Sequence, residues 1–207
     1  MLMDLDQSLF QLINKSLGNP IFDWIMPLLT HLGDKEVVWG ILVLIALFIP
    51  AERFLHTRQA GVISGRVSGI QSKLRVFALL ALIYGMNAGV YSLLKSAVDR
   101  DRPFELNLAE IRVDQHEAKS LSSNGSFPSG HSANSMMLAM ILAFAFVRFR
   151  WVFISIAALV AFSRIYLGVH FPLDTIIGAA IGGSISYLLL KSKFPSMILD
   201  TRQNKHE

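Results

Sequence analysis

Three short clusters of polar residues stand at the ends of apolar segments, and together they carry the groups that a phosphate-binding site needs. Within residues 95–103, 128–131 and 163–174, the candidates for such a site are three cations, two histidines, one carboxylate, a serine and a glycine: Lys95, Arg102, Arg164, His131, His170, Asp174, Ser129 and Gly130. Such charges are costly inside a bilayer, but at the ends of spanning segments they can converge on an anion at the membrane surface. The pattern predicts chemistry on a phosphate group by a membrane-embedded protein.

The cluster Pro128-Ser129-Gly130-His131 precedes a long apolar run and predicts the start of a helix. The first backbone N–H groups of a helix have no partner within it, so they suit an anion. Gly130 lets the backbone approach closely, and the Ser129 hydroxyl can donate to a phosphate oxygen. His131 stands at the mouth of this nest, where an imidazole can serve as a general acid. The alternative is an ordinary capped helix with an interfacial histidine.

The segment from Ser163 to Asp174 has the most specific spacing. Arg164 lies near the end of an apolar run, where its guanidinium needs a partner, and a phosphate would accept two hydrogen bonds from it. His170 and Asp174 are four positions apart, so on a helical backbone the carboxylate can reach one imidazole nitrogen and fix the tautomer. The other nitrogen could then attack phosphorus and form a phosphohistidine. A purely structural His–Asp pair is the alternative.

Lys95 and Arg102 belong to the remaining cluster, with Pro103 directly after the arginine. A phosphoryl transition state spreads negative charge over its equatorial oxygens, so cations placed in advance lower the barrier. The alternative is a pair of basic side chains that extend from the end of a span toward water.

The composition is that of a protein with several membrane spans. Of the 207 residues, 53% are hydrophobic and 16% charged, and the mean hydropathy is +0.48, whereas soluble domains carry about 25% charged residues. Cysteine is absent, which excludes disulfides and thiolate metal sites within this sequence. The net charge of +4 is modest, and the acidic start at residues 1–6 is unlike a cleavable signal peptide.

Five apolar runs indicate an all-α protein, a polytopic bundle of membrane helices. A span needs about 20 mostly apolar residues, and most of the runs reach that length with their flanks: residues 37–51, 76–94, 132–147, 151–167 and 175–190.

The start of the chain allows two interpretations. The segment 19–33 contains Asp23 and Pro27, so it is either a tilted sixth span or an interfacial segment. Residues 5–17 have apolar positions at near-helical spacing with charges between them, which predicts a helix on the membrane surface. We therefore expect one domain over residues 1–207, with six transmembrane helices, or five, after an N-terminal interfacial helix.

Loop charge predicts the orientation. The connections at residues 52–75, 148–150 and 191–205 are basic, and they lie on one side if each intervening run crosses once. By the positive-inside rule that side is cytoplasmic. The loop at residues 96–128 is richer in acids and should be extracytoplasmic, and all three clusters fall on its side. Six spans would place both termini in the cytoplasm.

With the three clusters in this order on one face, the chain resembles the type 2 phosphatidic acid phosphatase superfamily of integral-membrane lipid phosphatases. The resemblance covers residues 95–174 by motif and the whole chain by hydropathy and size. It implies that phosphate oxygens are bound by Lys95, Arg102, Ser129, the amide of Gly130, and Arg164.

The resemblance also implies the catalytic roles. His170 would be the nucleophile, Asp174 would orient it, and His131 would protonate the leaving oxygen and later activate water. The implied reaction needs neither a metal nor another cofactor, which fits a site with three cations and one carboxylate.

The implied substrate is a membrane lipid. Small bacterial members of the superfamily resemble undecaprenyl diphosphatases, which implies hydrolysis of undecaprenyl diphosphate to undecaprenyl phosphate at the outer face of a bacterial cytoplasmic membrane. Phosphatidylglycerophosphate, phosphatidate and lipid A phosphates are alternatives, because the clusters bind the phosphoryl group that all of them share. The loop at residues 105–125 would cover the site or contact the head group.

Two other functions are possible for a protein with these three clusters. A lipid phosphotransferase would pass the phosphate to another lipid instead of water. A non-catalytic lipid-binding protein is disfavoured, because anion binding alone does not need His131, His170 and Asp174. The expected partners are the lipid and the bilayer, with no nucleic acid, and the oligomeric state is left open.

Overall fold

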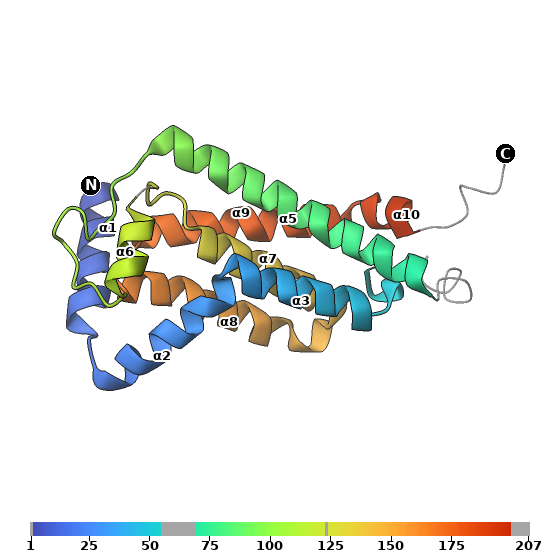
Figure 1. Ribbon diagram of the computed structural model, residues 1–207, viewed down its shortest axis with the longest axis horizontal. Helices are drawn as coiled ribbons and strands as arrows, with labels where there is room; N and C mark the ends of the chain where they lie inside the picture. The colour runs from blue at the N-terminus through green and yellow to red at the C-terminus, as the bar shows by residue number, and fades with distance from the viewer. Residues whose placement is uncertain (1, 55–68, 123, 200–207) are drawn as a thin grey trace.

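The computed structural model describes residues 2–54, 69–122 and 124–199, and every regular element among them is helical. The predicted all-α class is therefore confirmed for these residues. In chain order the elements are α1 (Leu2–Gln11), the π-helical turn η1 (Leu12–Ser16), α2 (Pro20–Thr30), the 3-10 turn η2 (His31–Gly33), α3 (Lys35–Phe48), η3 (Ala51–Phe54), α5 (Ile70–Val98), α6 (Gln115–Leu121), α7 (Gly130–Ala145), η4 (Val147–Phe149), α8 (Arg150–Tyr166), α9 (Pro172–Lys191) and α10 (Phe194–Leu199). The longer helices run roughly along the long axis of the molecule (Figure 1).

Three helical stretches in the described part of the chain are long and apolar enough to cross a bilayer: Ile70–Val98, Val147–Tyr166 and Pro172–Lys191. At most 33% of the most apolar part of each is buried, so apolar side chains face outward, as lipid contact requires. Helices α2, α3 and α7 have 11, 14 and 16 residues, below the roughly 17 that a span needs. The count of six spans is not confirmed and stays a prediction.

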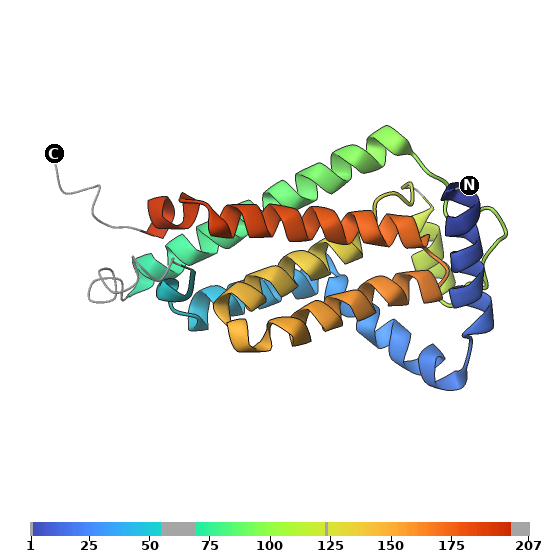
Figure 2. The same cartoon turned by 180° about the vertical axis from the view of Figure 1, so that it is seen from behind.

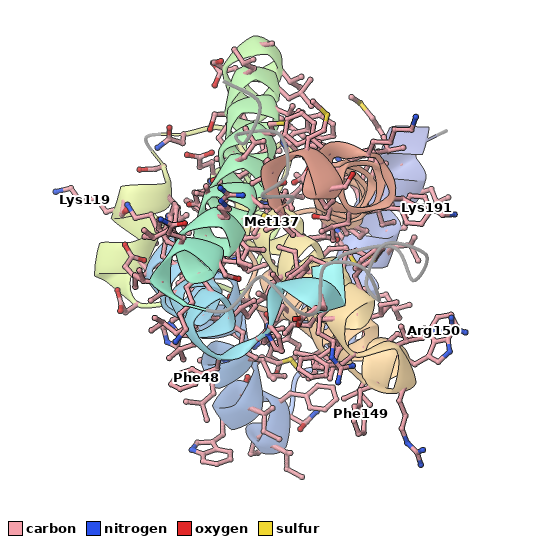
Figure 3. All side chains as sticks on the ribbon, turned by 90° about the vertical axis from the view of Figure 1, so that its right-hand side faces the viewer. Phe48, Lys119, Met137, Phe149, Arg150 and Lys191 are labelled. Atoms are coloured by element: carbon pink, nitrogen blue, oxygen red, sulfur yellow. The ribbon has the colours of Figure 1, made fainter. Side chains whose placement is uncertain are left out.

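Helix α7 lies at the centre of the bundle, packed between α8 and α9 (Figure 2). Its Met137 is fully buried and lies in the middle of the end-on view (Figure 3). Two glycines of α9 allow the close approach to α7. A Cβ at Gly178 would collide with the backbone oxygen of Ser129, and one at Gly182 with that of Ala133. This contact brings the start of α7 against the start of α9.

Replacing Gly182 by alanine should therefore destabilise the fold by about 1–3 kcal/mol, because a backbone oxygen cannot rotate away as a side chain would. Gly85 is the matched control, since a Cβ there meets nothing within 4 Å. Thermal unfolding in detergent should show a lower melting temperature for Gly182→Ala than for Gly85→Ala. Equal melting temperatures would contradict this account of the α7–α9 contact.

The two ends of the bundle differ in charge and in what covers them. One end collects α1, α6, the C-terminal ends of α5 and α8, and the N-terminal ends of α7 and α9 (Figures 1 and 2). The other end carries the basic turn at residues 148–150, and Arg150 and Lys191 project from its periphery (Figure 3). The predicted basic connections also include residues 55–68 and 200–207, which lie outside the described residues. The orientation in the membrane stays a prediction.

Helix α1 forms where the sequence predicts a surface helix, and it lies across the end of the bundle (Figure 2). Its Leu5 and Leu9 are exposed, whereas Phe10 is buried against the ring of Phe171, with 5.3 Å between centroids. An amphipathic helix with exposed leucines can rest on a membrane surface. Its interfacial position stays a prediction.

Candidate active site

His170 lies in the short connection between α8 and α9, where its side chain is buried. Its Nε2 atom is 3.3 Å from Nη1 of Arg102. Because a guanidinium can only donate, Nε2 accepts, and the ring proton then sits on Nδ1. Nδ1 faces Oδ2 of Asp174 at 3.6 Å, an ion-pair distance that is too long for a hydrogen bond. The predicted His170–Asp174 pair is therefore present, and the lone pair of the imidazole lies on Nε2.

The pKa of the His170 imidazole is held well below its ordinary value. Burial is the main cause, and the positive charges of Arg102, Arg164 and Lys95 act in the same direction. The ring is therefore neutral at pH values where an ordinary histidine is protonated. A neutral ring is what a nucleophile requires.

Carbonyl groups of the loop at residues 105–125 hold two of the predicted phosphate-binding cations. Nζ of Lys95 donates to the carbonyl of Gly125 at 2.6 Å, and Nη2 of Arg102 donates to the same oxygen at 3.2 Å. Nε of Arg102 donates to the carbonyl of Leu121 at 3.0 Å. Burial, followed by repulsion from other cations, lowers the pKa of Arg102 to about 10, so it remains charged at neutral pH.

Arg164 is completely buried near the end of α8. Its Nη1 donates to Oγ1 of Thr30 at 2.7 Å and to Oε1 of Glu117 on α6 at 3.2 Å. Within the described part of the chain, its Nε and Nη2 have no hydrogen-bond partner. Buried donors without partners are rare and costly. Nε and Nη2 of Arg164 therefore have the free donors that binding of an external anionic oxygen would need, and phosphate binding by Arg164 stays a prediction.

The predicted helix start at residues 128–131 is confirmed, because α7 begins at Gly130 with Ser129 as its N-cap. Oγ of Ser129 accepts from the backbone N–H of Ser132 at 3.4 Å. The backbone N–H of Ser129 donates to the carbonyl of Asp174 at 3.0 Å, which joins the second cluster to the third. Donation by the Ser129 hydroxyl to a phosphate stays a prediction.

His131 points to a residue that the sequence did not single out. Its Nε2 is 2.7 Å from Oδ1 of Asp34, which lies between η2 and α3. Burial of the Asp34 carboxyl opposes ionisation, but hydrogen bonds with His131 and His31 outweigh it and lower the pKa of Asp34 to about 2. A charged carboxylate therefore stands against His131 at neutral pH.

Asp174 is held by a second residue that the sequence did not single out. Nη1 of Arg100 donates to its Oδ1 at 2.6 Å, while Nη2 of the same arginine donates to Asp6 of α1 at 2.7 Å. The other oxygen of Asp6 accepts from the backbone N–H of Leu173 at 2.8 Å. The Arg100 guanidinium also lies 4.1 Å from the centroid of the Phe171 ring. Arg100 therefore joins two buried carboxylates and ties α1 to the start of α9.

Replacing Arg100 by glutamine should lower kcat by about 10- to 100-fold, because such supporting contacts orient the groups that react. It should also lower the melting temperature, since two buried carboxylates lose their shared cation. Arg148→Gln at the opposite end is the control, because Arg148 is exposed. An Arg100→Gln enzyme with wild-type kcat would show that this contact does not serve the site.

The structure brings all three predicted clusters to one end of the bundle, with the loop at residues 105–125 among them. Four residues that contact the predicted site residues were missed: Thr30, Asp34, Arg100 and Glu117. Arg100 lies inside the cluster at residues 95–103, and a second arginine two positions before Arg102 was the only signal for it. The others come from segments with no pattern of their own.

Comparison with known proteins supports the same interpretation. The model of the PAP2 superfamily matches residues 76–197. A lipid A 1-phosphatase of Rhizobium etli is 32% identical over 168 residues, which are 78% of this chain and 67% of that protein. An undecaprenyl-diphosphatase of Sulfolobus acidocaldarius is 42% identical over 64 residues, which are 30% of this chain and 31% of that protein.

A solved structure agrees over most of its length. The crystal structure of LpxE from Aquifex aeolicus matches with a TM-score of 0.67 and 26% identity, over 89% of this chain and 94% of that one. The family match includes all three clusters, and the structural match includes most of the bundle. The chain therefore belongs to the PAP2 superfamily.

Proposed function

We propose that this protein removes the terminal phosphate of a membrane lipid through a phosphohistidine on His170. As a member of the PAP2 superfamily with lipid phosphatases among its relatives, the chain is a lipid phosphatase. The observation that carries the proposed mechanism is the setting of His170: Nε2 lies beside Arg102, and Nδ1 faces Asp174. This arrangement suits a neutral nitrogen nucleophile surrounded by groups that bind phosphate.

In the first step, the lone pair of His170 Nε2 attacks phosphorus. The bond from phosphorus to the lipid oxygen breaks, and the leaving oxygen takes a proton from His131. The two unpartnered N–H groups of Arg164 and the guanidinium of Arg102 bind the charged oxygens of the transition state. Arg102 must therefore exchange its contact with Nε2 for a contact with the phosphate.

In the second step, water attacks phosphorus and the bond to Nε2 breaks. His131 takes the proton of the attacking water, and phosphate leaves. The negative charge of Asp174, close to Nδ1, stabilises the positive ring in the intermediate. No step needs a metal. In the described part of the chain, the His, Asp and Glu side chains form no group of three that could hold a metal ion.

Undecaprenyl diphosphate is the substrate that we put forward, at the outer face of a bacterial cytoplasmic membrane. The names of the relatives support lipid A and phosphatidylglycerophosphate about as well as undecaprenyl diphosphate. Phosphatidate presents the same phosphoryl group and stays a further alternative. Transfer of the phosphate to a second lipid would use the same residues. Hydrolysis is the simpler proposal, because it needs no binding site for a second lipid.

The test is phosphate release by the purified protein in detergent with excess chelator. The substrates are undecaprenyl diphosphate, lipid A, phosphatidylglycerophosphate and phosphatidate, each with and without added acceptor lipids. We expect release that survives the chelator and is fastest with undecaprenyl diphosphate. Faster release from another lipid would identify that lipid as the substrate in place of undecaprenyl diphosphate. Labelled phosphate on an acceptor lipid would show that the protein is a phosphotransferase and not a hydrolase.

A further inference from the structure

Asp34 is the first residue after η2 and the N-cap position of α3. An aspartate at this position ordinarily accepts from a backbone N–H of its own helix. In the described part of the chain, the Asp34 side chain makes no such bond. Its two oxygens instead hold two imidazoles, His131 through Oδ1 at 2.7 Å and His31 through Oδ2 at 2.8 Å. Among the described residues, helix α3 therefore lacks a side-chain cap, because the Asp34 carboxylate contacts His131 instead.

The turn before Asp34 is held tightly against the start of α7. A Cβ at Gly33 would lie 2.9 Å from Cβ of His131 and 3.0 Å from its backbone oxygen. The carbonyl of Gly33 accepts from Nδ2 of Asn134, one turn further along α7, at 3.4 Å. Thr30, at the other end of the same turn, accepts from Arg164. The position of Asp34 is thus fixed relative to both His131 and Arg164.

The charges around His131 make a carboxylate necessary there. Burial, followed by the positive charges of Arg164 from α8 and Arg102 from the loop after α5, lowers the pKa of His131 to about 4, although the hydrogen bond and charge of Asp34 raise it. A general acid must carry a proton and therefore a positive charge of its own before it reacts. Asp34 is the anion in direct contact with that ring. His31, whose side chain is 63% exposed, occupies the second carboxylate oxygen on the solvent side.

We propose that Asp34 is the positioning residue of the general acid. It holds the Nε2–H of His131, so that Nδ1 is the nitrogen that gives a proton to the leaving lipid oxygen and later takes one from water. This inference rests on the proposed function, because it assigns the proton transfers of that reaction. It also gives the site two His–carboxylate pairs, one for the nucleophile and one for the acid.

The test compares two leaving groups in the variant Asp34→Asn. The lipid phosphate in this test is phosphatidate, because its leaving group is an alcohol that needs protonation, whereas the nitrophenolate of p-nitrophenyl phosphate does not. With the lipid phosphate, kcat should fall about 10- to 100-fold with little change in KM. With p-nitrophenyl phosphate, the burst of nitrophenolate should keep its wild-type rate while the later steady rate falls, because water activation still needs His131. The burst amplitude gives the concentration of active enzyme. Rates divided by this concentration are therefore not lowered by unfolded protein in the preparation.

Two further variants sharpen the test. Glu36→Gln is the matched control, because it removes a carboxylate two positions away whose side chain is 72% exposed, and it should leave both rates unchanged. In the background of His131→Ala, Asp34→Asn should cause no additional loss, since Asp34 acts through His131. With the lipid phosphate, the alkaline limb of the kcat/KM profile should shift to lower pH in Asp34→Asn, because the protonated ring loses its carboxylate.

A fall in the nitrophenolate burst rate as large as the fall in kcat for the lipid phosphate, or losses that add to those of His131→Ala, would overturn the role of Asp34. Wild-type rates in Asp34→Asn would do the same. The proposed function fails in a different way: the wild-type protein would then give no burst, or His170→Ala would keep the wild-type rate. The two failures are therefore distinguishable in one set of measurements.

Discussion

Replacing His170 by alanine is expected to lower kcat for lipid phosphate release by about 10⁴-fold or more, because the variant loses the atom that bonds to phosphorus. The buried ring leaves a cavity beside Arg102, and added imidazole should enter it and restore part of the activity. The measurement is phosphate release with and without imidazole. An alanine variant within tenfold of the wild-type rate would show that another group attacks.

The same residue predicts the acid side of the pH profile. The nucleophile reacts only when His170 is neutral, and protonation abolishes it below the pKa of the ring. Because burial and the neighbouring cations lower that pKa, activity should persist well below the ordinary range of histidine. A kcat/KM profile that falls off near the ordinary pKa of histidine, about 6.5, would contradict the environment described for His170.

Replacing Arg164 by alanine is expected to lower kcat/KM by about 10²- to 10³-fold, which is the usual effect of losing one donor to a developing oxyanion. Lysine should not restore the activity, because a single ammonium group cannot present the planar pair of N–H groups that Arg164 leaves unpartnered. Steady-state kinetics on both variants make the comparison. A lysine variant with wild-type kcat/KM would exclude two-donor binding by Arg164.

Glu117→Gln is the companion variant, because it removes the anion that contacts Arg164 and keeps the guanidinium. The Glu117 carboxylate accepts from Nη1 of Arg164, close to where a phosphate oxygen would bind. Its loss should leave kcat/KM equal to or higher than that of the wild type. A loss as large as that of Arg164→Ala would mean that Glu117 positions the arginine instead of competing with the substrate.

The sequence predicted the parts of the site that depend on local spacing. Helix α7 begins at Gly130 as expected, because proline, serine and glycine before an apolar run specify a helix start by themselves. His170 lies just before α9 and Asp174 lies in its first turn, so the carboxylate faces one imidazole nitrogen as the spacing predicts, at an ion-pair distance. Asp174 turns its Oδ2 toward the backbone N–H of Phe171 at 2.9 Å, as a residue in the first turn of a helix often does. This leaves the imidazole at 3.6 Å.

The contacts that were missed join distant segments. Asp34 and His131 are 97 positions apart, and Arg100 and Asp174 are 74 positions apart. Neither pair can be found from a local pattern, because each depends on how the helix ends meet in space. The helix ends also differ from the limits of the apolar runs: α7 ends at Ala145, although the apolar run continues to residue 147. Hydropathy alone does not show where a helix stops.

The central claim is that phosphate is carried on His170, and trapping the intermediate tests it most directly. Labelled substrate would be mixed with the wild-type protein and with His131→Ala, in which water activation is impaired, and quenched under basic conditions that preserve phosphohistidine. Mass spectrometry would then locate the label. We expect phosphate on His170 in both, and a larger fraction in His131→Ala when the protonation-independent substrate p-nitrophenyl phosphate is used. Label on another residue, or phosphate release with no labelled protein at any time, would contradict the account.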